Sequence, residues 1–395
     1  MPVNYILEYW NKIQSGEIIV SKRIRQLYQK VIDELDHPIE PYIFDIELAN
    51  RPISFIETFC RNSKGKWAGK PISLLLWQKA MMQVIYGFVN KKTGLRRVRE
   101  VFVVTGRKNG KSVLTSGIGL FGMIEEQGAE IACVSTKMDA AKIVFNEALN
   151  MVKQSPYLNQ HIRKRKSDMY MDDMFSSFKP LSSKSNTLDG LNVSLGICDE
   201  VGAITDRNIY DVILQSQSTR QQPMMFSIST AGFVREGLFD TLHKYGADIL
   251  DGRLTDNEIP YGSFLPFFYE LDDPIEIDDP DMWIKANPSL GVIKSFDELK
   301  SNVERVKIDP TFLPTLRAKD FCIPGNVENA YLTPQELTNT ATFNILDFKG
   351  SYFIGGVDLS ETTDLTCATI LFPEIPQKRR LDRIRFHTIF SRSRG

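Results

Sequence analysis

A basic, glycine-containing octapeptide holds the residues whose types and spacing could do chemistry in this chain. It reads Thr105-Gly106-Arg107-Lys108-Asn109-Gly110-Lys111-Ser112, follows the apolar run 101–104 and precedes an expected helix over 113–126. A strand, a glycine-containing loop, Lys-Ser and a helix form the arrangement of a phosphate-binding P-loop. The stretch therefore predicts a nucleotide site, and the alternative is a basic strand-to-helix turn.

Each residue type of this loop has a task in phosphate chemistry. The backbone N–H groups of residues 106–112 would surround the β-phosphate, and Gly110 would let the backbone approach it closely. The positive end of the following helix would strengthen the field. Lys111 would reach the β- and γ-phosphates of ATP, while the Ser112 hydroxyl would bind Mg²⁺. Thr105 departs from the usual pattern, which has Gly at that position.

Two adjacent acids supply the second half of a hydrolytic site. The apolar run 193–198 ends at Asp199-Glu200. Asp199 would hold the Mg²⁺, usually through water, and Glu200 would orient and deprotonate the attacking water. A solvated acidic turn is the alternative, and the P-loop upstream makes that alternative the weaker one.

Two further segments could complete the site. The apolar strand 224–228 leads into Ser229-Thr230. Since the carboxyl ends of parallel strands line a ligand crevice, these hydroxyls could sense the γ-phosphate. A buried strand with a glycine turn is the alternative. Gln78, in an expected helix that runs to Phe88, could bracket the adenine ring with its amide, whereas for Trp77 we favour core packing.

Taken in order, these motifs resemble those of the large subunit of tailed-bacteriophage terminases. The resemblance covers nearly the whole chain. It rests on Tyr9-x-x-x-Ile13-x-Ser15-Gly16, Trp77-Gln78, Gly106–Ser112, Asp199-Glu200, Ser229–Gly232, Trp283-x-x-Ala286-Asn287-Pro288-Ser289-Leu290-Gly291 and Gly355–Ser360. A generic ATPase explains the Asn-Pro element and the Asp-Leu-Ser element poorly, so the set of motifs favours this family.

The resemblance implies an ATP-hydrolysing motor that packages double-stranded viral DNA into a procapsid. The implied partners are double-stranded DNA, a terminase small subunit and a portal protein. We expect a monomer in isolation and a homo-oligomeric ring when the motor is assembled. An arginine must neutralise the charge that develops on the phosphates. Arg107, Arg220 and Arg235 are candidates among which the sequence does not choose.

The fold class expected is α/β, a P-loop NTPase with a mainly parallel sheet flanked by helices. The expected parts are an N-terminal helical region (1–48), an ATPase domain with a lid-like segment (49–330), a linker (331–348) and an incomplete RNase H-like nuclease domain (349–395). Pro38 and Pro41 should end the amphipathic N-terminal helix. We expect hairpin and loop over 161–190, an acidic loop over 272–281 and a break at 310–314.

The expected nuclease activity is doubtful for this chain. A nuclease of this kind holds two metal ions, Mg²⁺ or Mn²⁺, with carboxylates from several strands. Asp358 ends the run 351–357 and is a good first ligand, whereas Asp364 reads better as a turn residue. Later strands and acids are absent before Gly395, which could reflect a truncated gene, a frameshift scar or a chain split across two reading frames.

Composition agrees with these predictions and decides little. The net charge is -1, so DNA would need a local basic surface, for which 91–92, 96–99 and 163–166 are candidates; solvated faces are the alternative. The sequence shows no signal peptide and no bilayer-spanning run. The 5 cysteines lack CxxC spacing, which favours a reducing cytoplasm over structural zinc. The resemblance to phage terminases implies that this is the cytoplasm of the bacterial host.

Two interpretations from other classes stay open. A helicase-like or other DNA-stimulated ATPase would share the ATPase motifs but would lack the Asn-Pro and Asp-Leu-Ser elements. An inactive prophage remnant is favoured by the short C-terminal part and by Thr105. Measuring ATP hydrolysis by the purified chain separates the remnant from both enzymes.

Overall fold

The computed structural model describes residues 2–182, 190–254, 262–324, 352, 354–358, 367–371 and 386–390. The chain divides into two compact units, Met1–Asn329 and Ala330–Gly395. The first unit is built on an eight-stranded sheet and the second contains a three-stranded sheet. Among the described residues, no helix is both long and apolar enough to cross a membrane.

The sheet of the first unit is mainly parallel, as expected. Its strand order is β10-β3-β9-β8-β4-β7-β6-β5, and the six strands from β10 to β7 run parallel. They are β3 (Glu100–Val104), β4 (Glu130–Ser135), β7 (Ser176–Ser182), β8 (Leu195–Asp199), β9 (Met224–Ser229) and β10 (Phe264–Phe268). The short strands β5 (Ile162–Lys164) and β6 (Met169–Met171) add an antiparallel edge.

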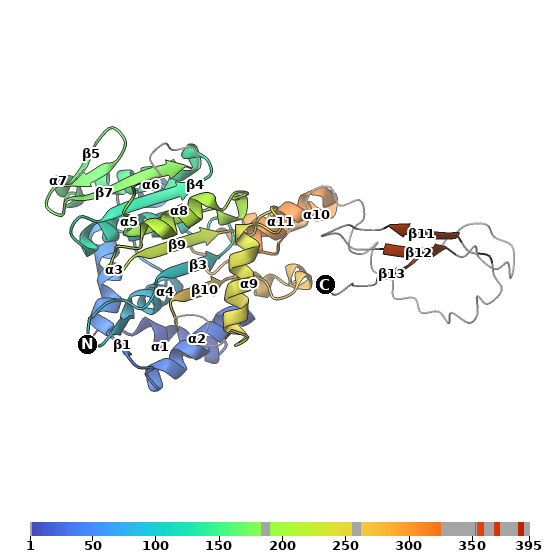
Figure 1. Ribbon diagram of the computed structural model, residues 1–395. Coiled ribbons are helices and arrows are strands. Elements are labelled where there is room, and N and C mark those ends of the chain that lie inside the picture. Colours follow the sequence, from blue (N-terminus) through green and yellow to red (C-terminus); the bar gives the residue numbers. More distant parts are fainter. Residues whose placement is uncertain are drawn as a thin grey trace. The chain divides into compact units, whose positions relative to one another are not determined.

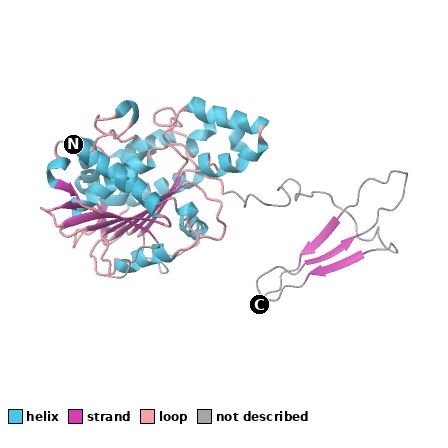
Figure 2. Cartoon of the chain, turned by 90° about the horizontal axis from the view of Figure 1, so that it is seen from above, coloured by secondary structure: helices cyan, strands magenta, loops and turns pink. Residues whose placement is uncertain are grey.

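Helices cover both faces of this sheet (Figures 1 and 2). Along β8, Ile197 faces α5 (Lys111–Glu125), which packs beside α6 (Met138–Gln154). Its neighbour Gly196 faces α8 (Asn208–Ser216). Since successive side chains of a strand point to opposite faces, α5 and α8 lie on opposite sides. Strand residues buried on both faces read as continuous apolar runs, which is why the parallel sheet was predictable.

The N-terminal helices join the same hydrophobic core as the sheet. They are α1 (Tyr5–Gln14), α2 (Lys22–Asp36), α3 (Ile46–Phe59) and α4 (Leu76–Gly87). The short strands β1 (Tyr42–Phe44) and β2 (Phe88–Asn90) pair antiparallel. The amphipathic stripe expected on the second helix is confirmed, because Ile24, Leu27, Tyr28 and Val31 are buried. The remaining elements here are α7 (Leu158–His161), α9 (Leu238–Leu250) and the 3₁₀ turns η1 (Gly65–Trp67) and η2 (Val201–Ala203).

Residues 271–323 form a helical segment with a small core of its own, and we call it the brace segment. It contains η3 (Pro274–Asp278), η4 (Pro280–Lys285), α10 (Phe296–Ile308), η5 (Pro310–Phe312) and α11 (Leu313–Asp320). Its core residues include Trp283, Leu299, Leu316 and Phe321. This small core is distinct from the main core around the sheet, to which Ala318 and Cys322 of the same segment belong.

Three sequence expectations about elements differ from the structure. The hairpin expected within 161–190 is present as β5 and β6, but this stretch also contributes β7 to the central sheet. The acidic stretch 272–281 is largely 3₁₀ helix, with Pro at the first turns. Residues 310–314 are not a simple break, since α11 begins there with Pro near its N-terminus, where a missing N–H costs nothing.

The second unit holds a three-stranded antiparallel sheet. Its strands are β11 (Ile354–Asp358), β12 (Cys367–Leu371) and β13 (Phe386–Phe390), paired in that order. The two expected strands are present, and the third, left open from the sequence, is present as well. Asp358 is the last residue of β11, as expected, and it pairs with Cys367. Asp364 lies outside the described residues.

Candidate nucleotide-binding and hydrolysis site

The strand order brings three of the predicted motifs together at the carboxyl ends of the parallel strands, which we call the sheet edge. The loop 105–110 follows β3, Glu200 follows β8 and Thr230 follows β9. Strand β9 lies between β3 and β8 and runs parallel to both, so all three carboxyl ends meet. The hydroxyl-bearing end of β9 therefore lies between the loop and the two acids.

The backbone of the loop has the conformation that a phosphate cradle needs. Lys108 and Gly110 have positive φ values of 62° and 83°. Gly110 is the N-cap of α5, and Lys111 is the first residue of that helix. Glycine carries no penalty in this left-handed region, whereas a β-carbon would. The helix N-terminus thus points its unpaired N–H groups at the loop.

Thr105 fits this loop without strain. Its hydroxyl donates to the carbonyl of Ala286 at 3.2 Å, and its backbone N–H donates to Ser229 at 3.0 Å. At the next position only glycine fits, because a Cβ on Gly106 would lie 2.3 Å from Oδ1 of Asn287 and 2.6 Å from the carbonyl oxygen of Asp320. The first glycine that this loop requires is therefore Gly106, one residue later than in the usual pattern. The requirement comes from the brace segment, which packs directly against the Gly106 backbone.

Asn109 ties the loop to the brace segment. It is fully buried. Its Nδ2 donates to the Gly106 carbonyl and to Oδ1 of Asn287, both at 3.0 Å. Its Oδ1 accepts from the backbone N–H of Ser289 at 3.0 Å. The Asn-Pro-Ser motif near residue 287 thus holds the loop in shape, a role that the sequence reading did not assign.

Lys111 and Glu200 face one another across the site. The Lys111 ammonium lies 3.6 Å from Oε1 of Glu200 and 3.5 Å from the Thr105 carbonyl oxygen. The Lys111 side chain is only 9% exposed, while that of Glu200 is 39% exposed. Neither lysine contact has the short distance of a strong charge-assisted hydrogen bond. The Lys111 ammonium therefore lies beside the loop and makes no short hydrogen bond to either of these two groups.

Asp199 is a buried carboxyl group next to Glu200. Burial and the neighbouring Glu200 raise its pKa to about 6, against the pull of Lys111 and of the Glu200 backbone N–H. That N–H donates to Oδ1 of Asp199 at 3.0 Å. A bound divalent ion would favour the charged form of Asp199, so this acid and the Ser112 hydroxyl stay the candidate ligands for Mg²⁺. No cluster of three or more His, Cys, Asp or Glu exists among the described residues, so phosphates and water would complete the shell.

The two hydroxyls at the end of β9 differ in what they contact. The Ser229 hydroxyl accepts from the backbone N–H of Gly202 at 2.9 Å and so fixes the turn after Glu200. The Thr230 hydroxyl lies 3.4 Å from Oε2 of Glu200. Of the two predicted sensors, Thr230 is therefore the one that faces the acid.

Gln78 lies beside the loop. Its Oε1 accepts from the backbone N–H of Leu75 at 2.9 Å, and a Cβ on Gly110 would lie 3.5 Å from its Nε2. Its role in adenine binding stays a prediction. Trp77 is buried in the core, as favoured, and donates from its indole to the Ser289 hydroxyl at 3.2 Å.

The three candidate arginines occupy different places. Arg107 is exposed on the loop. Arg235 pairs with Asp240 at 3.1 Å. Arg220 bonds to the carbonyls of Gly128 and Asn192, which precede β4 and β8, so it lies at the opposite edge of the sheet from the loop.

Sequence reasoning missed one cation of the site. Lys319, on α11, donates to the Thr230 hydroxyl at 3.1 Å and lies 3.9 Å from Oε2 of Glu200. Its side chain is 15% exposed. No local signal could have found it, because a lysine in a polar helix reads as a solvated residue. Only the packing of the brace segment on the sheet edge brings it here.

The basic clusters proposed for DNA contact fare differently. Arg96 and Arg97 are buried and pair with Glu125 and Glu34, so that hypothesis is wrong for them. Burial of a charged group requires such a partner, and these arginines serve the fold. The stretch 163–166 is exposed on the β5–β6 hairpin, although its two arginines pair with nearby aspartates.

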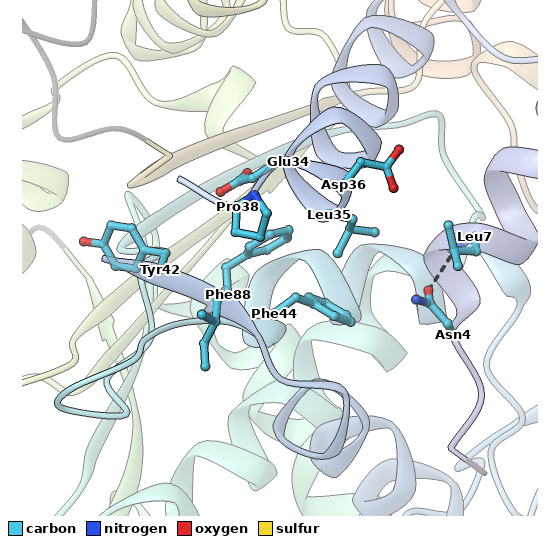
Figure 3. A pocket seen from close by; sticks show the side chains of 10 residues that line it. Asn4, Leu7, Glu34, Leu35, Asp36, Pro38, Tyr42, Phe44 and Phe88 are labelled. Carbon is cyan, nitrogen blue, oxygen red and sulfur yellow. Dashed lines mark hydrogen bonds between the residues drawn. The ribbon is translucent and has the colours of Figure 1, made fainter. Parts of the chain in front are cut away.

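A separate pocket of about 410 Å³ lies near the N-terminus (Figure 3). Apolar and aromatic side chains such as Leu35, Phe44 and Phe88 line most of it. Its two acids are Asp36 and Glu34, of which Glu34 is paired with Arg97. A site lined in this way offers no cation to a phosphate, so it does not compete with the loop as the nucleotide site.

Comparison with known proteins identifies the family. Residues 76–248 match the model for the ATPase domain of the terminase large subunit, and residues 258–380 match the model for its endonuclease domain. The chain belongs to the terminase large subunit family. The resemblance seen in the motifs is thus confirmed.

Two curated terminase large subunits align over most of the chain. That of Enterobacteria phage HK97 is 27% identical over 332 residues, covering 81% of this chain and 61% of the relative. That of Lactococcus phage p2 is 25% identical over 379 residues, covering 93% of this chain and 67% of the relative. The chain therefore spans about two thirds of the length of these terminases or slightly less.

A solved structure supports the fold of this terminase family member. The crystal structure of the HK97 bacteriophage large terminase superposes with a TM-score of 0.60 at 24% identity, covering 82% of this chain and 64% of that chain. The α/β fold predicted from the alternating strands and helices is confirmed.

Proposed function

We propose that this chain is an ATP-hydrolysing motor that drives double-stranded DNA into a viral procapsid. The observation that carries the proposal is the meeting of Lys111, Asp199 and Glu200 at one sheet edge, in front of a helix N-terminus. Phosphoryl transfer needs positioning and charge stabilisation from a protein, and this edge offers both. The family match supports DNA packaging as the work to which hydrolysis is coupled.

In this proposal the loop binds the triphosphate of ATP. The N–H groups of residues 108–112, in the loop and at the start of α5, would face the β-phosphate, because those of Gly106 and Arg107 donate to the carbonyls of Ala286 and Lys319. The Lys111 ammonium makes no short contact in the structure, and it would turn to the β- and γ-phosphates. Ser112 and Asp199 would hold Mg²⁺, which neutralises charge on the phosphates. Gln78 would lie toward the base, and Arg107, Lys108 and Asn109 complete the loop.

Glu200 is proposed as the general base. Its φ and ψ of 57° and 50° are those of the left-handed region, which costs a residue with a Cβ roughly 1–2 kcal/mol. Such strain persists only where surrounding structure maintains it, and here the Ser229–Gly202 bond does so. The result is a half-exposed carboxylate aimed toward the loop, where it can accept a proton from the attacking water.

The proposed partners are double-stranded DNA, a small subunit and a portal protein, met in the host cytoplasm. We propose that the chain works in a ring, in which an arginine from a neighbouring subunit completes each site. Hydrolysis that rises more than linearly with protein concentration would support this assembly. Full activity of a highly diluted monomer would count against it.

Asp358 is proposed as a metal ligand of a nuclease-type site in the second unit. It ends β11, where an RNase H-like fold places such an acid. We expect this acid alone not to support DNA cleavage, because two-metal hydrolysis needs carboxylates from several strands. Plasmid nicking in Mn²⁺ that is lost in Asp358→Ala would contradict that expectation and would establish the metal role of this acid.

The test of the motor is ATP hydrolysis by the purified chain, with and without double-stranded DNA. We expect slow, Mg²⁺-dependent hydrolysis that DNA or assembly accelerates. Failure to bind or hydrolyse Mg·ATP under any of these conditions would contradict the proposal.

A further inference from the structure

Lys319 occupies a place in the site that the roles proposed so far leave unused. It is the penultimate residue of α11, in the brace segment, far along the chain from the P-loop. Its ammonium donates to the Thr230 hydroxyl and faces Oε2 of Glu200. Lys111 faces the other oxygen, Oε1. Glu200 is therefore flanked by two lysines, one for each carboxylate oxygen.

The backbone of Lys319 is fixed as firmly as its side chain. Its carbonyl accepts from the N–H of Arg107 at 2.8 Å. The carbonyl of the next residue, Asp320, accepts from Nδ2 of Asn287 at 2.9 Å. The ammonium also lies 5.9 Å from the centre of the Phe233 ring. A lysine that serves only solubility would not be anchored at both ends in this way.

Nucleotide binding changes the balance around Glu200. When phosphates occupy the loop, the Lys111 ammonium is drawn to them, and Oε1 of Glu200 loses its cation. A single flexible carboxylate would then be free to rotate, or to be repelled by the phosphates, since like charges at close range disfavour one another. Lys319 and Thr230 lie near the other oxygen, Oε2, at 3.9 and 3.4 Å.

We propose that Lys319 is a positioning residue for Glu200: with Thr230, it holds the carboxylate in its catalytic orientation after Lys111 has moved to the phosphates. The proposal rests on the function proposed above. The proposal also links the position of α11 to hydrolysis, because a displacement of this helix would move the Lys319 ammonium away from Glu200. Lys319 acts on Glu200 and not on the nucleotide.

The first experiment compares ATP turnover and ATP binding in two variants at this position. Lys319→Met should lower kcat by about 10- to 100-fold, the cost of a misplaced catalytic group, while KM and the Kd of a fluorescent ATP analogue change little. Lys319→Arg should restore most of the turnover, since it keeps a cation on the same side. Thermal melting should show both variants folded. Lys307→Met is the matched control, an exposed lysine on α10 paired only with Glu304 among the described residues.

The second experiment is a double-mutant cycle with Glu200→Gln, read by single-turnover hydrolysis. If Lys319 acts through Glu200, Lys319→Met should add almost nothing in the Glu200→Gln background. A full additional loss in that background, or a loss of ATP affinity that matches the loss of kcat, would show direct phosphate binding and overturn the proposal. Unchanged kcat in Lys319→Met would overturn it too.

The two proposals fail in different ways. An active wild-type chain with an active Lys319→Met variant contradicts the positioning role alone. A folded wild-type chain that neither binds nor hydrolyses Mg·ATP contradicts the motor function, and the positioning role falls with it.

Discussion

Two lysine–carboxylate pairs near the P-loop differ in burial and in how tightly they are bonded. In the brace segment, Lys294 contacts Asp320 and Oδ1 of Asn287, both at 2.7 Å, and its side chain is 2% exposed. In the site, Lys111 and Glu200 stay 3.6 Å apart, and the carboxylate is 39% exposed. The first pair has the geometry that compensates desolvation. The second is loose, which leaves both groups free for a ligand.

This difference in bonding suggests different tasks for the two pairs, stability for Lys294–Asp320 and activity for Lys111–Glu200. Desolvation lowers the pKa of Lys294, and its partner Asp320 opposes that shift. Removing either partner would leave an uncompensated buried charge, so this pair should matter for stability. The site pair is loosely bonded, so under the proposed function it should matter for activity more than for stability. The following variants test that division, beginning with the largest effect.

Lys111→Ala should abolish ATP hydrolysis and weaken nucleotide binding, because Lys111 is the buried cation at the start of α5. Stability of the nucleotide-free protein should change little, since the pair with Glu200 is loose. Turnover and binding are measured beside Lys12→Ala, an exposed lysine of α1. Normal turnover in Lys111→Ala would remove the P-loop assignment.

Glu200→Gln should slow hydrolysis by about 10²–10⁴-fold while ATP binding persists, since only the base is lost. Equilibrium binding of a fluorescent nucleotide and single-turnover hydrolysis measure the two quantities separately. Glu304→Gln, at an exposed position of α10, is the control. Loss of binding in Glu200→Gln would mean that this acid has another role.

Lys294→Ala should lower the free energy of unfolding by about 3–5 kcal/mol, because Asp320 would remain buried without its cation. Denaturant unfolding measures this. The double variant Lys294→Met with Asp320→Leu should lose less, since no uncompensated charge remains. A destabilisation by Lys294→Ala no greater than that of Lys307→Ala would contradict the structural role.

Asp199→Asn should raise the melting temperature of the nucleotide-free protein by several degrees at pH 8. Burial raises the pKa of Asp199 to about 6 from an ordinary 3.8, so its ionisation above that pH destabilises the fold. The gain should shrink as pH falls through 6, because the native carboxyl then becomes neutral. Measurement in EDTA keeps cations out. An equal gain at pH 5 and pH 8 would contradict the pKa shift.

The local motifs of this chain could be read from the sequence because each is contiguous. The strand β3, the loop and α5 follow one another directly, so spacing alone indicated the phosphate cradle. The acids at the end of β8 were found in the same way. The strand β10 was missed, since its short run 264–268 follows a stretch without a clear period. The helix α11 was missed because its prolines suggested a break, although proline suits a first turn.

By itself, the sequence determined which residues are candidates for the chemistry and which family the chain resembles, since both depend on short patterns and their order. Only the tertiary structure decided how those residues are held. That Ala286 and Asn287 brace the loop, and that Lys319 faces Glu200, depends on contacts across 89 to 181 positions of the chain. The physical reason is that such contacts arise from the packing of the brace segment on the sheet edge, and no local propensity or period encodes that packing.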